Sequence, residues 1–174
     1  NNFDTSEMTD MSGMFASCGA YSGFTELDLT NFDTSNVLNM SRMFNGCHSG
    51  KITFGEKFIT SNVTDMSNMF ESFSGFFDVT NFNTTSVIDM SSMFADTWGS
   101  LDNLDLSSFN TSNVKDMNNM FSESSIKTIT FGDNFVTSNV ENMRSMFWGC
   151  SYLESLNLSG FDTSKVKNMG AMFS

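Results

Sequence analysis

The sequence predicts a single α/β domain built as a solenoid of about seven coils, each 24–29 residues long. Three observations lead to this fold class. The phrase Met-x-x-Met-Phe recurs seven times, Thr-Ser-Asn-Val or a close variant precedes every copy, and short alternating segments lie between copies. A fixed period of this length is typical of solenoids, whose repeats bury their apolar faces against one another. We expect a parallel β-ladder on one face and short helical or 3₁₀ turns opposite it.

The methionine phrase is expected to form the buried side of each coil. In its second copy, Val37, Met40, Met43 and Phe44 are spaced i, i+3, i+6 and i+7, which matches one face of a helix. A short extended piece followed by one helical turn has the same spacing, and so short a helix needs support from its neighbours. The predicted structural core consists of Met40, Met43, Phe44, Met66, Met69, Phe70, Met90, Met93, Phe94, Met117, Met120 and Phe121.

The alternating segments predict one strand per coil, with one face buried. They cover residues 27–29, 52–54, 77–79, 104–106, 129–131 and 156–158. Stacked strands of this kind lie about 4.8 Å apart. Two of the segments continue as Phe-Gly-x-x-Phe, at Phe54-Gly55 and Phe131-Gly132, and their link is one residue longer than in the other coils. The glycines there predict a bulge or a positive φ angle.

The outward residues of the predicted strands form a candidate binding face. Hydroxyl and carboxylate groups arrayed along a solenoid suit glycans or basic protein patches, and an exposed phenylalanine among them is a hot-spot candidate. For any single residue, a solvated sheet surface is the simpler interpretation. The candidate ligand-binding residues are Asp28, Thr53, Phe76, Asp78, Asp105, Thr130 and Asn157. Trp98 and Trp148 follow the methionine phrase, so we expect them on the side away from the strands.

A threonine recurs once per coil, at Thr5, Thr34, Thr60, Thr84, Thr111, Thr137 and Thr163. One hypothesis is an exposed face that binds ice or a mineral. The other is a hydrogen-bonded ladder that satisfies backbone groups between coils. The ladder is favoured, because phenylalanine on one side and valine on the other place the threonines at a corner.

Composition argues against several functions. The net charge is −12 with only eight Lys and Arg residues, so no positive stripe for nucleic acid is expected. No apolar run of about 18 residues is present, so we expect no membrane insertion by this segment. His48 is the only histidine and CxxC is absent, which predicts no metal site. Without a phosphate loop or a nucleophile beside a base, we expect neither a cofactor nor catalysis.

Cys18 and Cys47 occupy the same slot of neighbouring coils, within the reach of a disulfide. Together with Cys150 they make three thiols, which cannot all pair internally. The sequence leaves open whether Cys18 and Cys47 form a bond.

The run Phe-Asp-Thr-Ser-Asn-Val-x-x-Met-Ser-x-Met-Phe, clearest over residues 32–47 and 145–173, resembles a known repeat. It is similar to that of BspA-like leucine-rich-repeat surface proteins, and closer to the methionine-phrase variant of mycoplasmal surface lipoproteins. The resemblance covers essentially the whole chain, although Met8 and the Ile-Thr-Phe-Gly units depart from the pattern. It implies a right-handed, leucine-rich-repeat-like coil, exposure on a cell surface and a role in adhesion. The resemblance implies no shared ligand and no catalytic residue.

We therefore expect residues 1–174 to be one solenoid domain, a piece of a longer extracellular protein cut mid-repeat at both ends. Its expected function is adhesion at the cell surface, through an extended face that binds a host or matrix protein or glycan by avidity. The alternative is a purely structural spacer or stalk. A third hypothesis is ice or mineral binding through the threonines.

Overall fold

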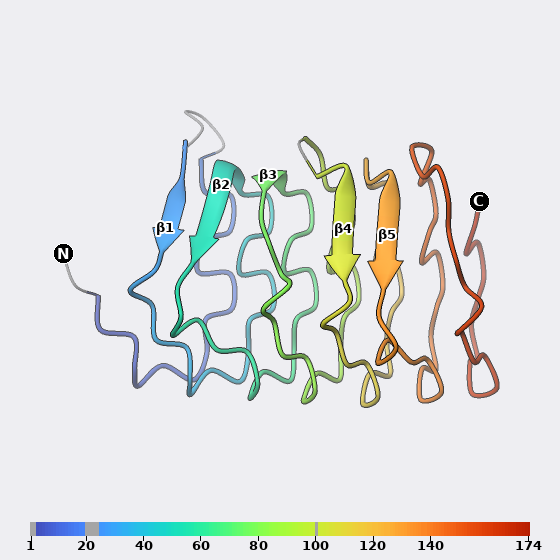
Figure 1. Cartoon of the computed structure of the whole chain (residues 1–174), viewed down its shortest axis with the longest axis horizontal. Helices are drawn as coiled ribbons and strands as arrows, with labels where there is room; N and C mark the ends of the chain where they lie inside the picture. The colour runs from blue at the N-terminus through green and yellow to red at the C-terminus, as the bar shows by residue number, and fades with distance from the viewer. Residues whose placement is uncertain (1–2, 20–24, 100) are drawn as a thin grey trace.

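The computed structural model describes residues 3–19, 25–99 and 101–174. Within them, successive repeats lie side by side along the long axis of the molecule (Figure 1). The strands are β1 (Leu27–Leu29), β2 (His48–Phe54), β3 (Ser74–Phe76), β4 (Asn103–Leu106) and β5 (Thr128–Phe131). Strands β1, β2 and β3 form one sheet, β4 and β5 form a second, and all neighbouring strands are parallel.

The predicted α/β, leucine-rich-repeat-like solenoid with seven helix-bearing coils is wrong, because the described residues contain no helix. The methionine phrase folds instead as consecutive tight turns. In its second copy, the N–H of Met43 donates to the carbonyl of Met40 at 3.2 Å, and the N–H of Cys47 donates to that of Phe44 at 3.0 Å. The φ angles of Arg42 and Gly46 are +57° and +61°, and residues with positive φ interrupt a right-handed helix.

The destination of the remaining N–H groups explains why turns replace the helix. A helix would use consecutive N–H groups within the segment. Here alternate N–H groups donate to the next repeat, with Met40 to Asp65 at 3.0 Å and Phe44 to Met69 at 2.9 Å. The same alternation recurs in each copy that has a following repeat. Parallel bridges next to these bonds connect Asp10, Asn39, Asp65, Asp89, Asp116, Asn142 and Asn168 in succession.

The strands also differ from the predicted continuous ladder. Residues 77–79 and 156–158 are not strands. Strand β3 ends just before residue 77, and Ser155, just before the second segment, forms a single parallel bridge with Thr128. Gly75 accounts for the shift at β3. It has φ +145°, and a Cβ there would lie 1.6 Å from the Ser49 carbonyl oxygen. The register of β2 and β3 is accordingly irregular between His48 and Lys51.

The twelve predicted core residues are all fully buried. Their four phenylalanines, together with Phe147, form a column along the molecule. Neighbouring ring centroids in this column are 5.3–5.8 Å apart and the rings are within 17° of parallel. Offset stacks at this distance add to the stability that apolar burial provides. The column comprises Phe44, Phe70, Phe94, Phe121 and Phe147.

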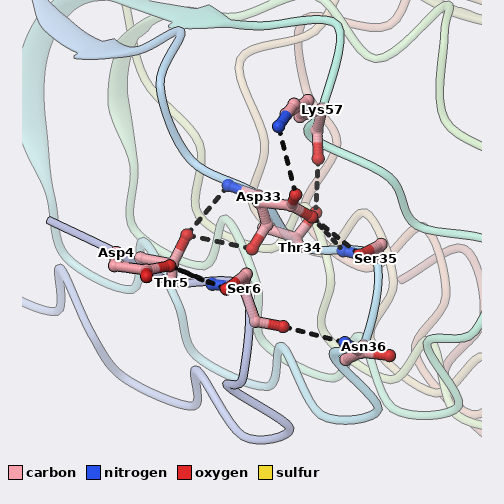
Figure 2. A network of polar contacts seen from close by, with 8 residues as sticks. All are labelled: Asp4, Thr5, Ser6, Asp33, Thr34, Ser35, Asn36 and Lys57. Carbon is pink, nitrogen blue, oxygen red and sulfur yellow. Dashed lines mark hydrogen bonds and ion pairs between the residues drawn. The ribbon is translucent and has the colours of Figure 1, made fainter. Parts of the chain in front are cut away.

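The recurring threonines lie inside and join neighbouring repeats. Six of the seven are buried, all except Thr163. Figure 2 shows the first junction, where Thr5 Oγ1 donates to the Asp33 carbonyl at 2.9 Å and accepts from the Asp33 N–H at 2.8 Å. In the same network, Asn36 Nδ2 donates to the Ser6 carbonyl at 2.8 Å. The hydrogen-bonded ladder is thus what the structure shows, and the buried hydroxyls do not form an exposed ice-binding or mineral-binding face.

The glycines of the two longer links serve close packing. Neither Gly55 nor Gly132 has a positive φ, and the register of β1 and β2 is regular through Phe54, so the predicted bulge or positive φ is wrong. A Cβ at Gly55 would lie 2.2 Å from the Thr30 carbonyl oxygen, and one at Gly132 would lie 2.2 Å from that of Ser107. The longer link therefore presses its backbone directly against the preceding repeat.

Candidate functional site

The predicted binding residues lie along one side of the molecule, close to the strands. Thr53 is half-buried and the other six residues are exposed, with Phe76 at 41%. Two pairs face each other across neighbouring strands, Asp28 with Thr53 and Asp105 with Thr130. Asp78 and Asn157 were predicted to lie in strands, but neither residue is in a strand.

The acidic residues of this face also stabilise the turns that follow the strands. Asp28 Oδ1 accepts from the N–H of Thr30 at 2.9 Å, and Asp105 Oδ1 accepts from that of Ser107 at 2.9 Å. These are Asx turns. The donated hydrogen bonds hold the pKa of the Asp28 and Asp105 carboxyls below the usual value. In the same way, Asp78 Oδ1 accepts from the N–H of Thr80, and Asn157 Oδ1 accepts from that of Ser159. The Asp-x-Thr/Ser pattern was the sequence signal for these turns, and it was missed.

Three of the predicted residues come together around two adjoining hollows. The larger, hollow A, has a volume of about 590 Å³, and the smaller has about 240 Å³. The smaller is lined by Lys51, Ile52, Thr53, Phe54, Phe76, Asp78 and Asn81. Phe54, Asp78 and Asn81 line both hollows. Thr53, Phe76 and Asp78 thus share one concave region, as expected of a small binding site.

Hollow A arises where a longer link is followed by a shorter one. Its floor is made by Phe54, Phe58 and Phe82, whose ring centroids are 4.5–5.9 Å apart. Its rim carries carboxylate, amide and hydroxyl groups together with an exposed aliphatic side chain. The rim residues are Gly55, Glu56, Ile59, Thr60, Ser61, Asp78, Asn81 and Asn83. Such a site offers an apolar surface bordered by hydrogen-bonding groups.

Asn157 lies at a separate hollow of about 300 Å³, hollow B, which is equivalent to hollow A. Hollow B follows the second longer link, and its floor is Phe131, Phe135 and Phe161. Asp133 takes the place of Glu56, and Asn157 takes that of Asp78. The remaining lining residues are Gly132, Val136, Ser159 and Gly160. Asp28, Asp105 and Thr130 line none of these three hollows.

Sequence reasoning placed Trp98 wrongly and overlooked Ile59 and Asn81. Trp98 forms a parallel bridge with Ser74, the first residue of β3, so it lies beside the strands rather than away from them. Its side chain is 48% exposed, and its Nε1 donates to Asp96 Oδ1 at 2.6 Å. Ile59 is 39% exposed at the edge of hollow A. The length difference between neighbouring links was the only sequence signal for the hollows.

The cysteines are free thiols in this structure. Cys47 is fully buried, and this burial, followed by the influence of Cys18, raises the pKa of its thiol to about 12. In the described ranges no three His, Cys, Asp or Glu side chains are grouped in a way that could hold a metal ion. The described part of the chain also has no helix of the length and apolarity needed to cross a membrane.

One family matches the sequence, and it is described as "Mycoplasma protein of unknown function, DUF285". The matches cover residues 1–52, 50–131 and 125–174. No curated protein and no solved structure matches the chain. Three successive matches agree with a protein made of repeats. Because together they span the whole chain, the protein belongs to the mycoplasma family DUF285.

Proposed function

We propose that this chain is the binding part of a mycoplasmal cell-surface protein, and that it attaches to a host or matrix protein or glycan. One observation carries the proposal: the exposed Phe76 lines the smaller of two adjoining hollows with polar rims. Exposed aromatic residues next to concave, partly apolar surfaces are typical energetic centres of binding sites. The polar groups around Phe76 would set the orientation of the partner.

Two further features support attachment by many weak contacts. The Asx-turn carboxylates and the outward threonines present similar groups at successive repeats. A partner with its own repeated groups would engage several of these together, and the effective concentration of each later contact would be high. The similarity of the methionine-phrase repeats to those of mycoplasmal surface lipoproteins supports a location outside the cell.

A structural spacer is the second candidate. The observation that favours it is the regular set of backbone hydrogen bonds between repeats, which runs from Met11 to Gly149. Such bonds stiffen a chain along its length. A spacer would need this stiffness and would have no partner at the strand face.

Multivalent display of the purified chain on beads, tested against an array of glycans and extracellular-matrix proteins, separates the two functions. If the chain is adhesive, the wild type should bind saturably, and Phe76→Ala should lower the affinity by roughly tenfold or more. Ile88→Ala is the control, because Ile88 is 46% exposed but lines neither hollow beside Phe76.

A second variant tests the acidic groups without breaking their turns. Asp78→Asn combined with Asp105→Asn keeps an Asx-turn acceptor, as Asn157 does naturally, but removes two charges. Binding should weaken while the melting temperature stays unchanged. A folded chain that binds nothing on the array would contradict the adhesive function and favour the spacer.

A further inference from the structure

The phenylalanine floors of hollows A and B repeat one geometry, although hollow A has about 590 Å³ and hollow B about 300 Å³. In hollow A, the ring centroids are 4.5 Å apart for Phe54–Phe58, 5.2 Å for Phe54–Phe82 and 5.9 Å for Phe58–Phe82. The equivalent distances in hollow B are 4.4, 5.5 and 5.9 Å, and the interplanar angles agree within 3°. Exposed carboxylates border each floor, Glu56 and Asp78 in hollow A and Asp133 in hollow B. A side chain that packs on the floor of the smaller hollow B should therefore also pack on the floor of hollow A.

We propose that hollows A and B each take one arginine or lysine side chain from a single extended segment of a basic partner protein. This inference rests on the proposed function and specifies the partner. The long methylene stems of these side chains pack on apolar surfaces, and their cationic ends are attracted to aromatic rings and carboxylates. The half-buried rings of Phe54 in hollow A and of Phe131 and Phe161 in hollow B supply the accessible aromatic surface, and the rim carboxylates supply the charge.

The charge distribution favours a cationic partner over an anionic one. The chain carries a net charge of −12. Two lysines near this face are already paired: Lys57 Nζ lies 3.5 Å from Asp33 Oδ2, and Lys127 Nζ lies 2.8 Å from Asp102 Oδ2. Among the described residues, Glu56 and Asp133 form no ion pair. A negative face of this kind speeds the approach of basic proteins and repels sulfated or sialylated glycans.

One positive charge does lie close by. Lys51 lines the smaller hollow beside Phe76, but it does not line hollow A. Asp78 borders both hollows, so its carboxylate adds negative charge on the side of hollow A that adjoins the smaller hollow. Between hollows A and B, the exposed Asp105 on β4 continues the acidic path.

The spacing of the hollows defines the partner segment. Hollow A borders β2 and hollow B borders β5, so the two are three repeats apart. The parallel bridges Asp65↔Asp89, Asp89↔Asp116 and Asp116↔Asn142 continue through these three steps, and at about 4.8 Å per bridge the separation is about 14 Å. An extended peptide advances about 3.3 Å per residue, and side chains an even number of residues apart project from the same side. Basic residues four positions apart, about 13 Å, match both requirements.

Synthetic peptides test the spacing directly. The probes are fluorescent Ser/Thr/Gly peptides of thirteen residues that carry two arginines four positions apart, two arginines three positions apart, or one arginine. Anisotropy titration of the full chain should give the tightest binding for the four-residue spacing. That preference should weaken as salt is raised, since the rim charges are exposed to solvent.

Matched variants assign the binding to the two hollows. Asp133→Asn, or Glu56→Gln combined with Asp78→Asn, should each bring the four-spaced peptide down to the affinity of the one-arginine peptide, a loss of roughly tenfold. Glu7→Gln removes the same charge at an exposed residue outside both hollows and should change little. Thermal melting confirms that each variant is folded.

The possible outcomes separate this inference from the function on which it rests. Equal affinity for the three-residue and four-residue spacings, or binding unaffected by the two hollow variants, would overturn the paired sites. If the bead array shows Phe76-dependent binding to a glycan or a neutral protein and the arginine peptides do not bind, the paired sites fall and the adhesive function stands. Failure of both assays would end both proposals.

Discussion

Thr84 and Asn110 exchange two hydrogen bonds across neighbouring repeats. Thr84 Oγ1 donates to the Asn110 carbonyl at 2.9 Å and accepts from the Asn110 N–H at 2.9 Å. One side-chain hydroxyl thus satisfies both backbone groups of a residue 26 positions away. The same two-way bond joins Thr5 to Asp33, Thr60 to Asn83 and Thr137 to Asp162. These four threonines join the corners of neighbouring repeats, whereas Thr34 and Thr111, which face the longer links, donate to the carbonyls of Ile59 and Val136.

Replacement of Thr84 by valine should lower the free energy of unfolding by about 2–4 kcal/mol, because two backbone groups near the core lose their partner. Thr84→Ser keeps the hydroxyl and should cost less than half as much. Urea denaturation measures both values. Thr163→Val, at the exposed member of the column, is the control and should be nearly neutral. Equal losses for valine at Thr84 and Thr163 would contradict the bonding role.

Ser92 adopts a backbone conformation that suits glycine. Its φ is +52°, at the position of the methionine phrase where Gly13 stands in the first repeat. Ser92→Val should lower the stability by about 1–3 kcal/mol, because β-branched residues are strained there. Ser92→Gly relieves the strain but adds flexibility to the unfolded chain, so it should be neutral or slightly stabilising. Denaturation measures the stability of both variants, with Ser91→Val as the control. If the methionine phrase were helical, Ser92→Gly would be less stable than Ser92→Val.

Gly55 is expected to tolerate no side chain. Gly55→Ala should destabilise the protein by about 1–3 kcal/mol, since the new Cβ would lie 2.2 Å from the Thr30 carbonyl oxygen. Gly160→Ala is a matched control, because a Cβ at Gly160 meets nothing within 4 Å. Differential scanning calorimetry should show a clear fall in melting temperature for Gly55→Ala alone. Similar melting temperatures for both variants would argue against the close contact.

Cys47 should make the stability depend on alkaline pH. Burial raises the pKa of its thiol from 9.0 to about 12 in the folded state, so folding favours the neutral thiol. This contribution is complete below about pH 9 and is lost as the pH rises toward 12. Under reducing conditions, the unfolding free energy of the wild-type chain should therefore fall more steeply above pH 9 than that of Cys47→Ala. Parallel curves would show that the buried thiol contributes nothing.

The side-chain pattern of the sequence was enough to predict the core. The spacing of Met40, Met43 and Phe44 placed all three inside, and all three are fully buried. The position of the threonines between phenylalanine and valine favoured the hydrogen-bonded ladder that the structure contains. Both inferences depended only on which side chains avoid water, and periodicity reports that property directly.

The same spacing could not distinguish a helix from consecutive turns. Helical turns and the observed turns both bring Met40, Met43 and Phe44 to one side. The difference lies in the backbone, where the N–H of Arg42 donates to the Ser67 carbonyl of the next repeat at 2.9 Å. That partner lies 25 residues away and exists only once the repeats are stacked.

The sequence by itself therefore determined the repeat, its buried columns and the acidic character of the surface. The tertiary structure alone decided the backbone conformation, the limits of the strands and the two hollows. The physical reason is that burial is encoded in each repeat, whereas hydrogen-bond partners and hollows depend on how neighbouring repeats align. Hollow A exists because the link that contains Gly55 is one residue longer than the link that packs beside it.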